Sequence, residues 1–314
     1  TQLRMDSDKT VLITGASTGI GLAVARELMR SKYRVYLTAR RTSLPRFAAH
    51  EIAESPHVRI RALDVTKEDE REAIVAEAER DWGGIDVLIN NAGVSYRAVV
   101  EHVVEEERVA QMGVNFRAPM ELIRLVLPGM RRRGAGRIIT ISSVGGMMAM
   151  PTMAAYSASK FALEGAHEAL WYEVRPWGIR VSLVQPGFID SDGFQKVRYT
   201  HKSDRSEHEL AEPYHEHYVN MAPFIGKVMK ASPATPESVA RVVLKTMHRR
   251  RPPLRVPATL DARVFALLRR VMPRSLYHWL LYKMLPKVDT WGPSPKRLSL
   301  LPSTPDEAQQ SEDA

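Results

Sequence analysis

The chain has 314 residues, 44 % of them apolar and 26 % charged, which predicts a globular protein with one large core or at most two domains. It contains no cysteine, which excludes disulfides and thiolate metal sites. No apolar run approaches the ~20 residues of a membrane span, and no signal peptide is recognisable. We therefore expect a cytoplasmic protein, either free or peripheral at a membrane surface.

The net charge of +9 is unevenly distributed. Residues 251–300 carry ten Lys and Arg against two Asp, whereas residues 301–314 carry four acids and no base. The basic excess thus belongs to the C-terminal region. A nucleic-acid-binding protein is disfavoured, because no basic face rich in aromatic residues is evident.

The N-terminal part predicts a phosphate-binding unit. After a frayed stretch over residues 1–9, residues 10–14 read as an apolar strand and a helical pattern runs to about Arg30. Glycines between a strand and a helix let backbone approach a pyrophosphate at the helix N-terminus. The candidate cofactor-binding residues here are Gly15, Ser17, Thr18, Gly19, Ile20 and Gly21.

The second predicted strand, residues 35–38, is followed by Ala39, Arg40 and Arg41. In dinucleotide folds an acid at this turn binds the ribose 2′-hydroxyl of NAD, whereas arginine accommodates the 2′-phosphate of NADP. Arg40 and Arg41 therefore favour NADP(H) over NAD. The alternative is a solvated surface pair.

Further apolar segments alternate with helical patterns along the chain. Strands are predicted at 58–63, 86–89, 137–141, 179–184 and 254–256, and helices at 67–82, about 103–133, about 153–175 and 236–248. This alternation predicts an α/β fold, a Rossmann-type doubly wound parallel sheet of about seven strands with helices on both faces. We assign it to residues 10–258.

The predicted helix over residues 103–133 contains Pro119, four positions after Asn115. Proline has no N–H to donate to the carbonyl four residues back, so a kink is expected there. A carbonyl of Asn115 without its helical partner could hold a water. The alternative is a simple kink in a packing helix.

Tyr156 and Lys160 are four positions apart, so on a helix over 153–175 they share one face. A fixed ammonium beside tyrosine favours the phenolate and lowers the tyrosine pKa from ~10 toward neutrality. Ser143 follows the strand at 137–141, at the sheet edge where parallel sheets bind ligands. Together the three side chains can hold a carbonyl or alcohol oxygen and move its proton.

Three methionines near this pair, Met148, Met150 and Met153, suggest an adaptable apolar wall for substrate, beside Ser143 and Tyr156. The alternative is ordinary core packing. Residues 192–235 form a long polar segment that we interpret as a helical substrate lid. Its four histidines, His201, His208, His215 and His217, lack an evident set of accompanying ligands, so we expect no metal.

Residues 259–290 predict two basic amphipathic helices. The apolar positions Val264, Phe265, Leu267, Leu268 and Val271 form a stripe on the first helix, and Leu276, Trp279, Leu280 and Met284 continue it on the second. Such helices could dock on the body and wall the substrate cleft, or lie on a membrane through residues 261–285. Residues 291–314 predict a flexible tail.

Over residues 10–256 the chain resembles the short-chain dehydrogenase/reductase family. The likeness rests on Thr14-Gly15-x-x-x-Gly19-x-Gly21, Asp64, Asn91-Ala92-Gly93, Asn115, Ser143, Tyr156-x-x-x-Lys160 and Pro186-Gly187. One departure is Ser191 in place of the family's threonine, which keeps a hydroxyl for the cofactor amide. Appended helices also occur in steroid- and retinoid-active members, which favours a bulky lipophilic substrate.

The resemblance implies an NAD(P)-dependent oxidoreductase that moves a hydride between nicotinamide and a carbonyl or secondary alcohol. It implies Tyr156 as general acid/base, Ser143 as the holder of the substrate oxygen, and Lys160 on the nicotinamide ribose. Asn115 would anchor a proton-relay water through its main chain. The implied cofactor contacts also include Asp64, Val65, Asn91, Ala92, Gly93, Pro186, Gly187 and Ile189.

Family members pair long helices, which implies a homodimer or homotetramer. Two other functions stay open at this point. One is a reductase of acyl-carrier-bound 3-oxo substrates that uses the basic C-terminal region to meet an acidic carrier. The other is a non-enzymatic NADP-binding sensor, which the intact Ser143, Tyr156 and Lys160 disfavour.

Overall fold

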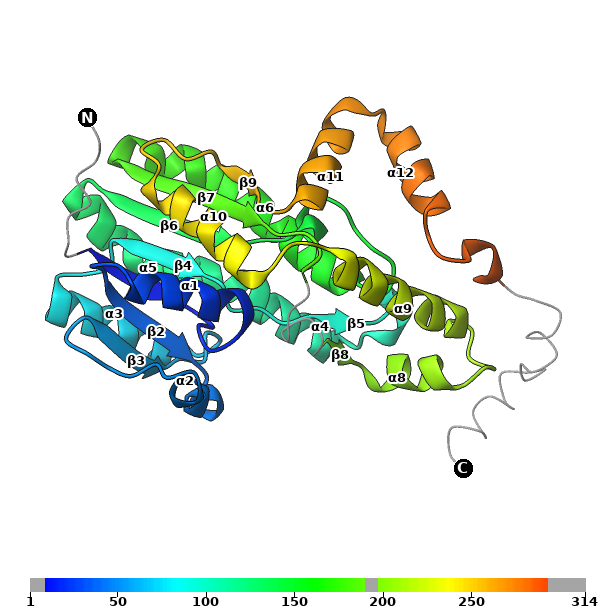
Figure 1. Cartoon of the computed structure of the whole chain (residues 1–314), viewed down its shortest axis with the longest axis horizontal. Coiled ribbons are helices and arrows are strands. Elements are labelled where there is room, and N and C mark those ends of the chain that lie inside the picture. The colour runs from blue at the N-terminus through cyan, green and yellow to red at the C-terminus, as the bar shows by residue number, and fades with distance from the viewer. Residues whose placement is uncertain (1–8, 190–196, 293–314) are drawn as a thin grey trace.

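The computed structural model describes residues 9–189 and 197–292 (Figure 1). Seven parallel strands form one sheet in the order β3-β2-β1-β4-β6-β7-β9. Their bounds are β1 (Thr10–Ile13), β2 (Arg34–Ala39), β3 (Val58–Ala62), β4 (Val87–Asn90), β6 (Gly136–Ile141), β7 (Ile179–Gln185) and β9 (Arg255–Pro257). The predicted doubly wound sheet is therefore confirmed, and its strand order reverses between β1 and β4.

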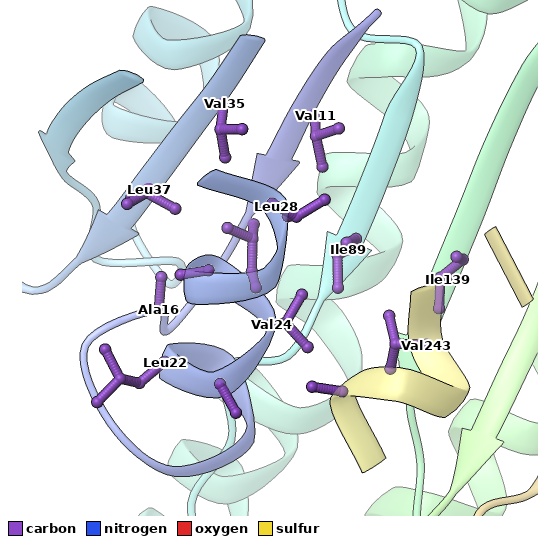
Figure 2. Close-up of a cluster of buried hydrophobic side chains, with 14 of the residues drawn as sticks. Val11, Ala16, Leu22, Val24, Leu28, Val35, Leu37, Ile89, Ile139 and Val243 are labelled. Atoms are coloured by element: carbon purple, nitrogen blue, oxygen red, sulfur yellow. The ribbon is translucent and has the colours of Figure 1, made fainter. Parts of the chain in front are cut away.

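Helices cover both faces of this sheet, which explains why its central strands β1 and β4 are nearly continuous apolar runs. The first face carries α1 (Gly19–Met29) and α10 (Pro236–His248), and the second carries α3 (Glu68–Trp82), α5 (Ala118–Arg133) and α6 (Ala154–Val174). In Figure 2, Val24 of α1 and Val243 of α10 face Val11, Ile89 and Ile139 of the strands. The short helix α2 (Pro45–Ala49) follows β2.

The α10 helix begins where its sequence predicts. Thr235 is the N-cap residue, and its hydroxyl accepts a hydrogen bond from the Ser238 N–H at 3.2 Å. Pro236 takes the first helical position, where its missing N–H removes no helical bond.

The helical region around Pro119 is two α-helices joined by a π turn, where a single kinked helix was expected. The first is α4 (Glu105–Met112), and the π turn spans Gly113–Arg117 before α5 begins. The Ala118 N–H donates to the Gly113 carbonyl, one residue farther than in an α-helix. The irregularity thus includes Asn115 and ends two residues before Pro119, whose nitrogen has no hydrogen to donate.

The segment interpreted as a lid lies beyond the carboxyl edge of the sheet. Its described part comprises β8 (Arg198–Tyr199), which pairs with β5 (Tyr96–Arg97), and the helices α8 (His201–His208) and α9 (His215–Ala231). Ser191, and most of the expected frayed start and flexible tail, lie outside the described residues.

Two C-terminal helices, α11 (Leu260–Val271) and α12 (Arg274–Lys283), form an arch that projects from the body (Figure 1). Phe265 packs against a cluster that includes Phe188 and Ile225, but Val264, Leu267 and Val271 are exposed. Only part of the predicted apolar stripe is therefore docked on the body, through Phe265. In the described part of the chain, no helix combines the length and apolar character needed to cross a bilayer.

Candidate active site

The glycine turn forms a cradle at the N-terminus of α1. Gly15 has φ +66°, and a side chain there would lie 3.0 Å from the Ala92 Cα. A side chain on Gly21 would overlap the Gly15 carbonyl. The first turn of α1 carries no acidic residue. Within the described residues, the side chain of its N-cap residue, Thr18, makes no capping hydrogen bond. Its backbone donors can therefore receive the pyrophosphate of a dinucleotide.

The segment Asn91–Gly93 is fastened to this cradle. The Asn91 side-chain amide donates to the carbonyls of Thr14 and Gly15, both at 3.0 Å. In return, the Thr14 hydroxyl accepts the N–H groups of Asn91 and Ala92, each at 3.0 Å. Asn91, expected as a cofactor contact, thus holds the glycine turn in shape, while Gly93 is exposed beside it.

The expected adenosine end of the cofactor site lies after β2 and β3. Arg40 and Arg41 are both exposed, whereas Val65 is buried and Asp64 half-buried. Burial raises the pKa of Asp64, but hydrogen bonds from Thr66 and the charges of Lys67 and Arg40 outweigh it and lower that pKa overall. Arg40 is therefore exposed on the side of the site where its charge acts on Asp64.

Ser143 and Tyr156 meet across the carboxyl end of β6. The Ser143 hydroxyl accepts the Gly145 N–H at 3.0 Å, and a hydrogen bond links Ser143 to Tyr156. A side chain on Gly145 would lie 2.9 Å from the Tyr156 Cε1 atom, so this close approach requires glycine. The predicted pairing of serine and tyrosine is present in the folded chain.

Lys160 lies one turn after Tyr156, as the spacing predicts, but its electrostatic effect differs from expectation. Its Nζ donates to the Ile141 carbonyl at 2.9 Å and stands 5.9 Å from the Tyr156 ring centre. Burial lowers the pKa of Lys160 to about 8, against the opposing effect of Glu164. Burial also raises the pKa of Tyr156, although the bond with Ser143 opposes this. The expectation of a depressed tyrosine pKa is therefore wrong here, because burial raises that pKa and outweighs the lowering effect of Ser143.

Asn115 is connected to the helix of Tyr156 through Ser159, a residue that the sequence reasoning missed. The Asn115 amide donates to the Ser159 hydroxyl at 3.0 Å, and Ser159 donates to the Tyr156 carbonyl at 2.7 Å. The Asn115 side chain also exchanges two 2.9 Å bonds with the backbone of Val94. A serine three positions after Tyr156 on the same helix was the available signal.

The turn after β7 is held by the start of α11. The Gly187 N–H donates to the Thr259 hydroxyl at 2.9 Å, and the Phe188 N–H donates to the Asp261 carboxylate at 2.7 Å. Pro186 and Ile189 are buried. Thr259 and Asp261 were not singled out from the sequence, although Thr-x-Asp before an apolar helix is an N-cap signal.

The methionines lie at different depths. Met153 is fully buried and Met148 almost so, whereas Met150 is half-buried and lines a cleft of about 490 Å³. Val99, Val100, Glu101, Pro151, Thr152, Ala154, Tyr214 and His217 complete its lining. Met153 therefore belongs to the packed interior, and Met150, six residues before Tyr156, faces the cleft. Within residues 9–189 and 197–292, no three acid or histidine side chains converge as metal ligands.

Comparison with known proteins agrees with this arrangement. A family model described as short chain dehydrogenase matches residues 9–202. The 3-ketodihydrosphingosine reductase of Bacteroides thetaiotaomicron is 35 % identical over 275 residues, covering 86 % of this chain and 96 % of the relative. Human 17-beta-hydroxysteroid dehydrogenase type 1 is 32 % identical over 252 residues, covering 78 % of this chain and 76 % of the relative.

Solved structures give the same result. A short-chain dehydrogenase from Streptomyces avermitilis superposes with a TM-score of 0.73 at 30 % identity, covering 88 % of this chain and 98 % of the other. A metagenomic short-chain oxidoreductase in complex with NADP superposes with a TM-score of 0.61 at 29 % identity, covering 79 % of this chain and 96 % of the other. The chain therefore belongs to the short-chain dehydrogenase family and is an NAD(P)-dependent oxidoreductase of CH–OH and C=O groups.

Proposed function

We propose that this chain reduces the ketone of a long-chain lipid, with NADPH as the preferred cofactor. The observation that carries the proposal is the cleft beside the start of α6, with apolar walls from Val99, Val100 and Met150. The similarity to a 3-ketodihydrosphingosine reductase, which extends over nearly its whole length, supports the same substrate class.

The residues present fit a nicotinamide dinucleotide. The glycine cradle and the uncapped start of α1 suit its pyrophosphate, and Arg40 and Arg41 suit a 2′-phosphate. Asp64 and Val65 would flank the adenine, and the turn Pro186–Ile189 would frame the nicotinamide. When bound, this cofactor supplies the hydride.

In this proposal Tyr156 acts as the general acid. Because burial raises its pKa, the phenol is protonated at neutral pH and can donate its proton to the oxygen of the reduced carbonyl. Ser143, hydrogen-bonded to Tyr156, would hold the same oxygen. Lys160 would bind the nicotinamide ribose, and Asn115 would anchor a relay water and orient α6 through Ser159.

The cleft has a polar rim as well as apolar walls. The Tyr214 hydroxyl donates to the Glu101 carboxylate at 2.8 Å, and the Tyr214 and His217 rings lie 5.0 Å apart. Tyr214 and His217 stand at the start of α9, so the segment proposed as a lid supplies one side of the cleft. This arrangement suits a lipid whose chain lies along the apolar walls and whose polar end meets the rim.

The test is a substrate panel with the full-length protein and NADPH. It compares 3-ketodihydrosphingosine, a 17-ketosteroid and a short aliphatic ketone by the loss of reduced-nicotinamide absorbance. Each buried methylene contributes ~0.8 kcal/mol, so a few of them should raise kcat/KM for the long-chain ketone by at least ~100-fold over the short one. Preference for the steroid, or equal turnover of the long and short ketones, would contradict the proposal.

We also infer a homodimer through α5 and α6. A groove of about 340 Å³ between these helices is lined by Met120, Ile123, Leu127, Pro128 and Leu170, with Arg124, Arg131 and Glu173 at its sides. Apolar side chains flanked by both charge signs suit contact with a second copy. Light scattering of the purified protein tests this inference, and a monomer at micromolar concentration would contradict it.

A further inference from the structure

The α11 helix carries an apolar stripe that faces away from the protein. Leu260, Val264, Leu267 and Val271 follow one another at intervals of four, three and four, which places them on one side of a helix. Their side chains are between 46 % and 69 % exposed. A continuous row of this kind is more than the scattered exposed apolar residues of an ordinary surface.

The opposite side of α11 is anchored, so the direction of the stripe is set by packing. Ala262 is fully buried, and Phe265 packs against the cluster of Phe188 and the α9 helix. The Arg269 guanidinium stacks over the Phe161 ring of α6 at 5.3 Å. These contacts, and the hydrogen bonds that Thr259 and Asp261 accept from Gly187 and Phe188, fix α11 with its stripe outward on the projecting arch of Figure 1.

The charges around the stripe have one sign. With about 100° per residue, Arg263 and Arg270 lie roughly 70–90° from the stripe centre, on the same edge. Arg274, Lys283 and Lys287 add positive charge farther along the arch. Between residues 260 and 288 the sequence has one acid, Asp261, and its carboxylate accepts the Phe188 N–H.

The arch also exposes aromatic residues suited to a lipid–water boundary. Trp279 and Tyr282 of α12 are more than half exposed, and both have an apolar ring with a polar tip. Such side chains settle at the level of the headgroups, where apolar and polar surroundings meet.

We propose that the α11–α12 arch is a docking surface for an anionic membrane. The stripe would enter the boundary between headgroups and acyl chains, with Arg263 and Arg270 beside the lipid phosphates. A second copy of this chain fits less well, because an isologous contact through the stripe would bring the same arginines together. The contact is with the surface of the bilayer, as α11 and α12 have 12 and 10 residues.

The arch leads back to the cleft. After α12 the chain reaches Trp291, whose ring lies 4.5 Å from the His217 ring, and His217 lines the cleft. A membrane under the arch would thus lie near the entrance used by a lipophilic substrate. The docking itself does not depend on the proposed substrate, since vesicle binding is measured without turnover.

The experiment is co-sedimentation of the full-length protein with vesicles of phosphatidylcholine alone or mixed with phosphatidylserine. Leu267→Glu puts a negative charge into the stripe. The double change Arg263→Glu with Arg270→Glu reverses the sign of the charge along the edge of the stripe. Val109→Glu is the matched control for the first change, because Val109 is 62 % exposed on α4 and Leu267 is 59 % exposed. Arg241→Glu, on an exposed position of α10, controls for the loss of a positive charge.

We expect binding to the anionic vesicles that weakens with added salt and falls at least ~10-fold in both stripe variants but in neither control. Equal binding to both vesicle types, no binding, or full binding by Leu267→Glu would overturn the proposal. So would a Leu267→Glu protein that changes from dimer to monomer and keeps its vesicle binding, since the stripe would then be an interface between copies.

Discussion

The backbone N–H of Phe188 donates a 2.7 Å hydrogen bond to the carboxylate of Asp261, a residue 73 positions farther along the chain. Thr259 accepts the neighbouring Gly187 N–H, so the start of α11 braces the turn that follows β7. The turn proposed to frame the nicotinamide is thereby held by the C-terminal arch.

This brace predicts a defect in cofactor binding when Asp261 is changed. In Asp261→Ala the Phe188 N–H loses its charged acceptor, a bond worth ~1.5–3 kcal/mol, so the Kd for NADPH should rise at least ~10-fold. Asp261→Asn keeps an acceptor oxygen and should recover most of the affinity. Fluorescence titration of NADPH measures both, and equal affinity in Ala and wild type would show that the brace has no role in binding.

Removal of the Tyr156 hydroxyl should separate binding from chemistry. Tyr156→Phe keeps the ring that packs against Gly145 but loses the proton donor, so turnover should fall by ~10²-fold or more. The Kd for NADPH should stay within about twofold of wild type. Steady-state rates and cofactor titrations decide the matter, and near-normal turnover would refute Tyr156 as the acid.

Gly145 should affect turnover although it has no side chain, because the Tyr156 ring packs directly against it. In Gly145→Ala the new methyl would lie 2.9 Å from the Tyr156 Cε1 atom and displace the ring, so kcat should drop at least ~10-fold. Gly165→Ala is the control, since it lies on α6 with no atom within 4 Å of the added methyl. It should preserve activity and stabilise the helix by ~0.5–1 kcal/mol, measured by urea unfolding.

Arg40 and Arg41 should decide the choice between the two nicotinamide cofactors. A charge-assisted bond to a 2′-phosphate predicts at least ~10-fold higher kcat/KM with NADPH than with NADH. Arg40→Leu with Arg41→Leu should remove that preference and leave the NADH rate nearly unchanged. Arg46→Leu, on the neighbouring α2 and also exposed, should have no effect. An unmodified protein that uses NADH equally well would contradict the assignment.

His167 predicts a loss of stability in mild acid. Burial lowers its pKa to about 4, with the Lys160 charge in the same direction, while its ring bonds to Thr140 and the Leu163 carbonyl. The unfolded chain binds a proton near pH ~6.5 and the folded chain only near 4, so stability falls as the pH drops through this range. At pH 5 this should make the free energy of unfolding about 2 kcal/mol lower than at pH 8.

His167→Gln tests this, because glutamine can keep a donor and an acceptor but does not titrate. Between pH 8 and 5 the free energy of unfolding of wild type should fall by about 2 kcal/mol more than that of the variant, by urea denaturation. Parallel pH profiles for the two proteins would show that His167 is not the responsible group. His57→Gln, at an exposed position, serves as the control.

Local patterns determined much of this protein. The continuous apolar runs predicted the parallel strands, since a strand covered on both faces needs no polar alternation. The helix start at Pro236 and the face shared by Tyr156 and Lys160 also followed from spacing alone, because both depend on neighbours within one turn. The glycines at 15 and 21 marked the cradle, since positive φ and close backbone contact exclude side chains.

Tertiary packing decided the rest. A helical period shows that Val264, Leu267 and Val271 share a face. The burial of Ala262 and the packing of Phe265 on the other side turned that face outward. Spacing likewise brought Lys160 near Tyr156, whereas the pKa of the tyrosine depends on how much water the whole fold removes from it. The bonds from Asn115 to Ser159 and from Phe188 to Asp261 join segments 44 and 73 residues apart. Such contacts leave no periodic trace in the sequence, because they arise only when separate elements pack together.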